Sequence, residues 1–302
     1  GYGYWGRVLT RVARSSPDAH LLMISDTDPS RRAEAANLSG VEVVDDAETV
    51  FRDPRIQAVF IATPVSSHAV LVRGALRAGK DVFVEKPMTG TLSEAEEIVR
   101  LAEAEGRVLM VDHPFLFTGS VRKIRELVAD GDLGRLQYFD SERVNLGLLR
   151  SDVNVLWDLA PHDISILQYL LGRTPSGARA VASSHTQNAH ADPHGEIAHL
   201  HLDYPDGFTA HIAVSWLSPV KIRKIILGGD RKMVLFDDIS PSEKVKIYDY
   251  GIGIDASAAT PFRPLYRSGD VLIPKYDDRE AMQLAVDHFV SCVRNREKPL
   301  TD

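Results

Sequence analysis

Two segments of the chain carry side chains that could move a proton. Asp158 and His162 are four residues apart, so on a helix the carboxylate and the imidazole lie on one face. Imidazole has an unperturbed pKa near ~6.5, which suits a general base near neutral pH. Lys86, within Glu85-Lys86-Pro87, could donate to an oxygen that develops negative charge. Alternatively, His162 only caps its helix and Lys86 lies in a surface turn.

The chain opens with a glycine pattern, Gly1-Tyr2-Gly3-Tyr4-Trp5-Gly6. A G-x-G-x-x-G turn lets the backbone approach a pyrophosphate, which the first N–H groups of the following helix then bind. Asp26 follows twenty residues after Gly6, where a carboxylate would accept ribose hydroxyls and repel a 2′-phosphate. The pattern therefore predicts NAD. Arg31 and Arg32 leave NADP open as the less favoured cofactor, and a turn that binds no nucleotide is the alternative.

Short apolar runs alternate with amphipathic segments over the first third of the chain. This pattern predicts a parallel sheet covered by helices on both faces. The ends of such strands face a ligand crevice, so Thr63-Pro64, the nearby His68 and Glu85-Lys86 should lie near a cofactor. The strand that normally precedes the glycine turn is absent, so we expect further residues before Gly1. We expect strands over 19–26, 58–63, 81–85 and 107–111, and helices over 29–37, 67–78 and 92–105.

The pattern changes near residue 115, and we expect one domain over 1–116 and a second over 117–302. In the second we expect helices over 121–130 and 157–171, a half-exposed strand over 136–144, and then mainly strands. A turn at 205–207 predicts a hairpin in which Leu202 faces Ala210 and Leu200 faces Ile212, because this register matches apolar face to apolar face. The stretch 251–269 is expected to be a long loop. The second domain should therefore contain an antiparallel sheet.

Composition excludes several classes of partner. The 302 residues are 44% hydrophobic and 25% charged, with a formal net charge of 35 − 42 = −7. That profile fits a globular protein and argues against nucleic acid or an anionic membrane as the main partner. No apolar run approaches the ~18–20 residues of a membrane span, no signal peptide is visible, and Cys292 is the single cysteine. We therefore predict a cytoplasmic protein.

Histidines in the second domain could indicate a metal. His199 and His201 share a predicted strand face with His211 on the neighbouring strand, which could assemble a zinc site. No cysteine supports such a site, and the face could equally be solvated or lie between subunits. We therefore predict no metal.

Several motifs together resemble the Gfo/Idh/MocA oxidoreductase family over essentially the whole chain. They are the glycine turn, Ala62-Thr63-Pro64 followed by His68, the segment 75–80 leading into Glu85-Lys86-Pro87, and Asp158-x-x-x-His162. The resemblance implies an N-terminal Rossmann domain, a C-terminal α+β domain with a large open antiparallel sheet, and a homodimer or homotetramer joined through that sheet. It also implies a cis Lys86–Pro87 bond.

Segments 111–117, 143–147 and 154–163 are similar to the sugar-nucleotide 3-dehydrogenases of this family. The family often has Asp three residues after the histidine, where this chain has Ser165; this departure weakens any transfer from the inositol and glucose branches. The predicted activity is hydride transfer between NAD and a secondary alcohol or ketone of a sugar or sugar nucleotide. An inositol or free-aldose dehydrogenase and a non-catalytic NAD-binding regulator are the alternatives.

The predicted site residues follow from the motifs and the resemblance together. Lys86, His162 and Asp158 are catalytic, and Arg143, Asn145, Asn154 and Trp157 bind the substrate. The cofactor-binding residues are Gly1, Gly3, Tyr4, Trp5, Gly6, Asp26, Thr63, Pro64, His68, Glu85 and Lys86.

Overall fold

The chain folds into two compact units. The structure, a computed structural model, describes residues 1–147, 149, 153–186, 195–254 and 264–301. Unit 1 comprises Gly1–Phe117 and Arg279–Asp302, and unit 2 comprises Thr118–Asp278. The first division lies one residue from the predicted boundary. The structure departs from the predicted division at the C-terminus. The last 24 residues, expected in the second domain, pack with unit 1.

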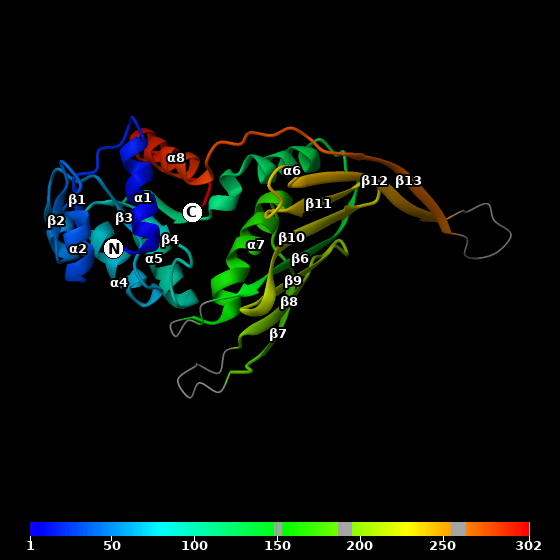
Figure 1. Cartoon of the computed structure of the whole chain (residues 1–302), viewed down its shortest axis with the longest axis horizontal. Coiled ribbons are helices and arrows are strands. Elements are labelled where there is room, and N and C mark those ends of the chain that lie inside the picture. Colours follow the sequence, from blue (N-terminus) through cyan, green and yellow to red (C-terminus); the bar gives the residue numbers. More distant parts are fainter. Residues whose placement is uncertain (148, 150–152, 187–194, 255–263, 302) are drawn as a thin grey trace. The chain divides into compact units, whose positions relative to one another are not determined.

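Unit 1 has the alternating strand–helix order of a Rossmann-like domain (Figure 1). Its strands form two separate parallel sheets, β1-β2 and β3-β4-β5, and no strand among the described residues joins them. The elements are α1 (Tyr4–Ser15), β1 (Met23–Ser25), α2 (Pro29–Ala35), β2 (Glu42–Val44), α3 (Ala47–Arg52), β3 (Ala58–Ile61), α4 (Val65–Arg77), β4 (Asp81–Glu85), α5 (Leu92–Ala104), β5 (Leu109–Asp112), the 3-10 helix η1 (Pro114–Phe117) and α8 (Ala281–Asn295).

Burial explains why these segments form strands. All five residues of β4 and all four of β5 are buried, as expected for strands covered on both faces. The helices α4 and α5 are each followed by a glycine with positive φ, Gly79 at 74° and Gly106 at 59°. Only glycine adopts this conformation without steric cost, so both helices end where the sequence predicts.

Helix α8 belongs to unit 1 because its apolar face is covered there. It packs against α1 and η1. Phe289 on α8 is fully buried, and its ring centroid lies 5.6 Å from those of Phe60 on β3 and Phe83 on β4. An amphipathic pattern reveals that a helix has a face to bury, but not which domain covers it.

Unit 2 is built on an eight-stranded sheet in the order β13-β12-β11-β10-β6-β9-β8-β7. All neighbouring strands are antiparallel except β6 and β9, which are parallel. Helix α7 packs on β6, β8 and β9. The elements are α6 (Gly119–Ala129), β6 (Leu136–Leu146), α7 (Val155–Leu171), β7 (Gly177–Ser183), β8 (Ile197–Asp203), β9 (Thr209–Ser215), β10 (Leu217–Gly229), β11 (Met233–Asp237), β12 (Val245–Ile254) and β13 (Pro264–Leu272).

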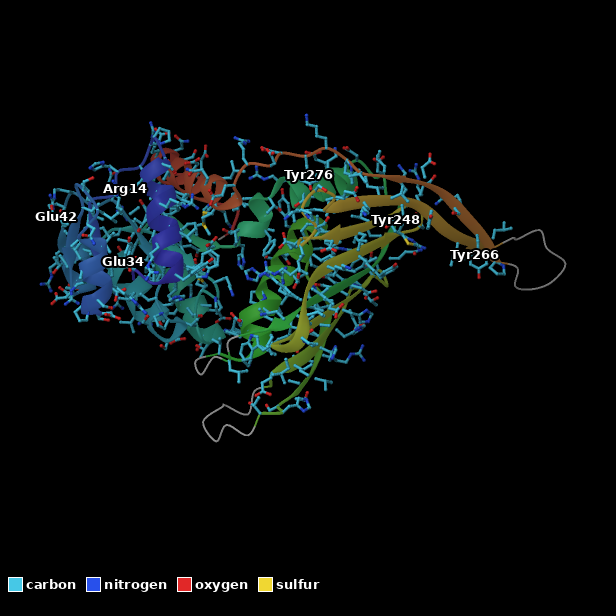
Figure 2. All side chains as sticks on the ribbon, in the orientation of Figure 1. Arg14, Glu34, Glu42, Tyr248, Tyr266 and Tyr276 are labelled. Carbon is cyan, nitrogen blue, oxygen red and sulfur yellow. The ribbon has the colours of Figure 1, made fainter. Side chains whose placement is uncertain are left out.

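The predicted hairpin is confirmed, with Leu202 opposite Ala210 and Leu200 opposite Ile212. The prediction of a long loop over 251–269 is wrong in part. Strand β12 runs to residue 254 and β13 begins at residue 264, and residues 255–263 lie outside the described ranges. Tyr248 on β12 and Tyr266 on β13 mark this hairpin in Figure 2. The prediction failed because this segment is rich in glycine and polar residues, as loops are. In the structure, pairing between the two strands satisfies the hydrogen bonds of the backbone.

None of the helices in the described ranges combines the length and the apolar character that a bilayer crossing requires.

Candidate active site

The glycine turn has the geometry that nucleotide binding needs. A Cβ atom on Gly1 would lie 2.5 Å from the Ala62 carbonyl oxygen, and one on Gly6 would lie 2.0 Å from the Gly1 carbonyl oxygen. Both glycines are therefore fixed by close backbone packing. A Cβ on Gly3 would meet nothing nearer than the Arg31 guanidinium at 3.8 Å. The turn thus leaves open space at Gly3, the residue that a pyrophosphate would approach.

Helix α1 begins at this open space. Gly3 is its N-cap residue, and no side chain of the described residues caps that end. The first N–H groups of a helix need acceptors, and a phosphate supplies them. Tyr4 and Trp5 occupy the first turn with side chains that are 72% and 43% exposed. The arrangement is therefore suited to an anionic ligand at the start of α1.

Asp26 is tied to the glycine turn. It follows β1, and its Oδ2 accepts from the backbone N–H of Tyr2 at 2.6 Å while Oδ1 accepts from that of Asp28 at 2.8 Å. Burial raises the pKa of Asp26, but the two backbone donors together with nearby positive charge, including Arg31, lower it overall. Asp26 is therefore a carboxylate held beside the turn, with the Arg31 guanidinium 3.6 Å away.

His68 connects the two strand ends that the sequence singles out. Its side chain is buried, with Nε2 2.9 Å from the carbonyl oxygen of Thr63 and Nδ1 3.0 Å from that of Pro87. Thr63 follows β3 and Pro87 follows β4, so the imidazole bridges these two segments. Pro64, next to Thr63, is exposed and is the N-cap residue of α4.

Lys86 directly follows β4, and the Lys86–Pro87 bond is cis, as the family resemblance implies. The preceding residue, Glu85, is buried and pairs in register with Asp112 at the end of β5. Asp112 was not among the predicted site residues. Its signal in the sequence was the polar residue ending an otherwise apolar strand, one position before His113.

In unit 2, Asp158 and His162 lie on successive turns of α7 and are both half-buried. The Trp216 indole Nε1–H donates to Asp158 Oδ2 at 3.2 Å. Asn145 is near the same tryptophan, because a Cβ on Gly147 would contact both the Trp216 ring and the Asn145 amide. Trp216 was missed by sequence reasoning, since a lone tryptophan at the end of a strand is ordinary core composition.

Two predicted substrate ligands use their side chains within the fold. Asn154 is the N-cap residue of α7, and its Oδ1 accepts from the Trp157 backbone N–H at 2.8 Å. Arg143 is 3% exposed and binds both carboxylate oxygens of Asp163 at 2.8 and 2.9 Å. Trp157 is 40% exposed. The structure therefore gives Arg143 and Asn154 partners inside unit 2.

The predicted histidine face exists on the sheet of unit 2. The rings of His201 and His211 lie 4.7 Å apart, and each bonds an aspartate at 2.8 Å, Asp203 and Asp140 respectively. Within the described ranges, no group of three or more His, Cys, Asp or Glu side chains is arranged to hold a metal ion.

The site residues thus form two groups, each defined within its own unit. Unit 1 brings together the glycine turn, Asp26, the strand-end pair bridged by His68, and Lys86 with its acidic neighbours. Unit 2 brings together Asp158, His162, Trp216 and Asn145 around the start of α7.

Comparison with known proteins assigns a family to this arrangement. Residues 1–113 match the oxidoreductase family with an NAD-binding Rossmann fold, and residues 121–234 match the GFO/IDH/MocA C-terminal domain. The chain belongs to the Gfo/Idh/MocA oxidoreductase family.

Individual relatives agree with this family. The chain is 35% identical over 175 residues to the uncharacterized oxidoreductase YdgJ of Escherichia coli K12, a match covering 54% of this chain and about half, 49%, of YdgJ. It is 24% identical over 315 residues to the scyllo-inositol 2-dehydrogenase (NAD(+)) of Bacillus subtilis 168, covering 99% of this chain and 85% of the relative.

Among solved structures, the UDP-N-acetylglucosamine 3-dehydrogenase GnnA from Acidithiobacillus ferrooxidans superposes with a TM-score of 0.80. The sequences are 21% identical, and the match covers 100% of this chain and 89% of that one. At this identity the likeness describes the fold.

Proposed function

We propose that this protein is an NAD-dependent oxidoreductase that transfers hydride between nicotinamide and a secondary alcohol or ketone of a sugar or sugar nucleotide. The observation that carries the proposal is Lys86, held at the carboxyl end of β4 in a unit that also has a complete glycine turn. In open parallel sheets, ligands bind outside the carboxyl ends of the strands. Family membership supports the reaction class.

The residues of the glycine turn fit a dinucleotide. Gly1, Gly3 and Gly6, with the free start of α1, would hold the pyrophosphate, and Asp26 would accept the ribose hydroxyls. Thr63, Pro64 and Glu85, near the ends of β3 and β4, would border the nicotinamide side. When bound, NAD supplies the hydride acceptor, and reduced NAD the donor.

The acid–base work falls to three side chains. His162 takes the hydroxyl proton of the alcohol as general base, and returns it in the reverse direction. Asp158, one helical turn earlier, is fixed by the Trp216 indole and orients either the imidazole or a substrate hydroxyl. Lys86 donates to the reacting oxygen and stabilises its alkoxide character. The proposal requires Lys86 and His162 to act on the same substrate carbon.

The cofactor choice is NAD over NADP. The carboxylate of Asp26 stays ionised beside the turn and would repel a 2′-phosphate. Arg31, 3.6 Å from Asp26 and 44% exposed, is the feature that favours NADP. Comparing kcat/KM for the two cofactors tests this choice, and a preference for NADP would overturn it.

The substrate class has two candidates. The resemblance of segments 143–147 and 154–163 to the sugar-nucleotide 3-dehydrogenases favours a sugar nucleotide. The Bacillus subtilis relative favours an inositol or a free aldose. A panel of inositols, aldoses and UDP-sugars, followed by NADH absorbance, separates them. Binding of UDP alone would support the sugar nucleotide, and its failure together with turnover of an inositol would support the alternative.

Assembly and location complete the proposal. We expect a homodimer or homotetramer joined through the large sheet of unit 2 and located in the cytoplasm. The molar mass in solution tests the assembly, and a monomer at assay concentration would contradict it.

Replacing Lys86 by Ala is the direct test of the catalytic assignment. We expect turnover to fall by at least about a hundredfold, as general acid–base groups typically contribute, while NAD still binds. Lys123→Ala, on the surface of α6 in unit 2, is the control that should keep full activity. An unchanged rate in Lys86→Ala would refute the assignment. A chain that binds NAD but turns over no member of the panel would be the non-catalytic regulator instead.

A further inference from the structure

Two acidic side chains face each other directly beside Lys86. Glu85 ends β4 and Asp112 ends β5, and the two residues are register partners in adjacent parallel strands. Register partners project to the same face of a sheet, so their carboxyl groups are neighbours. Glu85 is 7% exposed and Asp112 is 1% exposed. Two acids therefore meet in a place that water hardly reaches.

This pair must hold a proton. The two carboxyl groups lie side by side at buried register positions. An ionised carboxylate only accepts hydrogen bonds, so a hydrogen bond between the two groups requires an O–H on one of them. One oxygen of each group, Glu85 Oε1 and Asp112 Oδ1, is buried without a hydrogen-bond partner among the described residues. Two full negative charges here would be unscreened and unsatisfied.

The electrostatics agree with this geometry. Burial raises the pKa of Glu85 well above its ordinary value, and the neighbouring Asp112 raises it further. Burial also raises the pKa of Asp112, to about 7. The pKa values of Asp26 and Glu196, by contrast, are lowered, because hydrogen-bond donors outweigh burial there. Near neutral pH the pair carries one proton and one negative charge.

Lys86 and His113 are the other titratable groups that act on this pair. The Lys86 ammonium lowers the pKa of both Glu85 and Asp112. Burial, and then the charge of Lys86, lowers the pKa of His113 to about 4, so its imidazole is neutral near pH 7. The negative charge of the pair is therefore balanced by Lys86 and not by His113.

We propose that Glu85 and Asp112 share one proton and act as positioning residues for Lys86, their single negative charge orienting its side chain toward the reacting oxygen. With one shared proton, the protonated acid donates a hydrogen bond to the ionised acid, so the pair carries one negative charge and not two. The inference rests on the proposed function only through the role of Lys86.

The first test detects the proton itself. Infrared difference spectra of the full chain with NAD, recorded on either side of neutral pH, report protonated carboxyl groups. We expect a protonated carboxyl band that persists at pH values where exposed acids are ionised. The near-isosteric variants Glu85→Gln and Asp112→Asn should each change this band, and the double variant should abolish it. The control is Asp81→Asn at the opposite end of β4, where Asp81 is fully buried but bonded to Arg296, and this variant should keep the band. A wild-type chain without the band, or a double variant that retains it, would overturn the shared proton.

The second test addresses the positioning role. Each single variant keeps one ionisable acid beside Lys86, so the loss of kcat in either single variant should be smaller than in the double variant. The double variant keeps none, and its kcat should fall by at least about tenfold, a loss of roughly 1.4 kcal/mol, while KM changes little. A fully active double variant would refute positioning. The infrared result stands apart from activity, so failure of the Lys86→Ala test would refute the proposed function without removing the shared proton.

Discussion

Arg143 illustrates how burial constrains the role of a charged side chain. Its guanidinium binds Asp163 through two hydrogen bonds, and the two side chains are 4% and 1% exposed. Replacing Arg143 by Met would leave an uncompensated buried carboxylate, which typically costs about 3–5 kcal/mol. We expect this loss in the free energy of unfolding measured with urea. Removing both charges in Arg143→Met/Asp163→Leu should recover much of it. A variant that keeps its stability but binds substrate more weakly would instead support the substrate contact that the sequence predicts.

Asp112 makes a prediction about stability and pH. Its pKa is raised by burial from 3.8 to about 7 in the folded state, and the unfolded chain has the ordinary value. Between about pH 4 and about pH 7 the folded state therefore binds more protons than the unfolded state, and stability falls as pH rises. A single group with this shift contributes about 4 kcal/mol over that window. The free energy of unfolding, measured with urea, should therefore fall less between about pH 4 and about pH 7 in Asp112→Asn than in wild type. In Asp81→Asn it should depend on pH as in wild type. A wild-type slope in Asp112→Asn would contradict the assignment.

At the scale of single elements, the glycine turn and α1 can be tested by two alanines. Gly6→Ala places a Cβ 2.0 Å from the Gly1 carbonyl oxygen, so it should destabilise the turn and abolish NAD binding together. Gly3→Ala meets only Arg31 at 3.8 Å, so the fold should survive while NAD affinity falls by about tenfold or more, at least roughly 1.4 kcal/mol. Thermal unfolding and NADH fluorescence titration separate the two effects. Unchanged NAD affinity in Gly3→Ala would mean that the turn does not hold the pyrophosphate.

The predictable elements are those whose signal is local. The stops at Gly79 and Gly106 depend on a backbone conformation that one residue type adopts freely, so the helix ends were correct. The hairpin register follows from matching apolar faces across one turn. Strand β2 and helix α3 were missed because they span three and six residues, too short for a periodic signal.

Side-chain partners were the least predictable part of the site. Asn154 and Arg143 have the chemistry of substrate ligands, but in the fold one caps a helix and the other is neutralised by Asp163. Helix α7 supplies both partners. Its backbone N–H binds Asn154, and its Asp163 binds Arg143 on β6. Asp112 was overlooked for the same reason, since its importance arises only when β5 lies beside β4.

For the whole molecule, the path of the chain decides what each unit contains. The chain leaves unit 1 after Phe117, builds the whole of unit 2, and returns at Arg279 to add α8 to unit 1. Composition does not change abruptly at residue 279, and a helix pattern there is compatible with either unit. The cofactor-binding unit is therefore discontinuous in sequence, and its stability depends on the last residues of the chain.

Phe289 tests this dependence. It is fully buried on α8 against Phe60 and Phe83, so Phe289→Ala should destabilise unit 1 by about 3–5 kcal/mol. A ligand raises the unfolding temperature of the part that binds it, so NAD identifies the transition of unit 1 in a thermal scan. We expect Phe289→Ala to lower that NAD-responsive transition. Phe236→Ala, an equally buried phenylalanine on β11, is the matched control and should lower the transition of unit 2. The opposite result would be an unchanged NAD-responsive transition and a lowered transition of unit 2. In that case α8 stabilises unit 2, and the second domain extends from residue 117 to the end of the chain, as the sequence predicts.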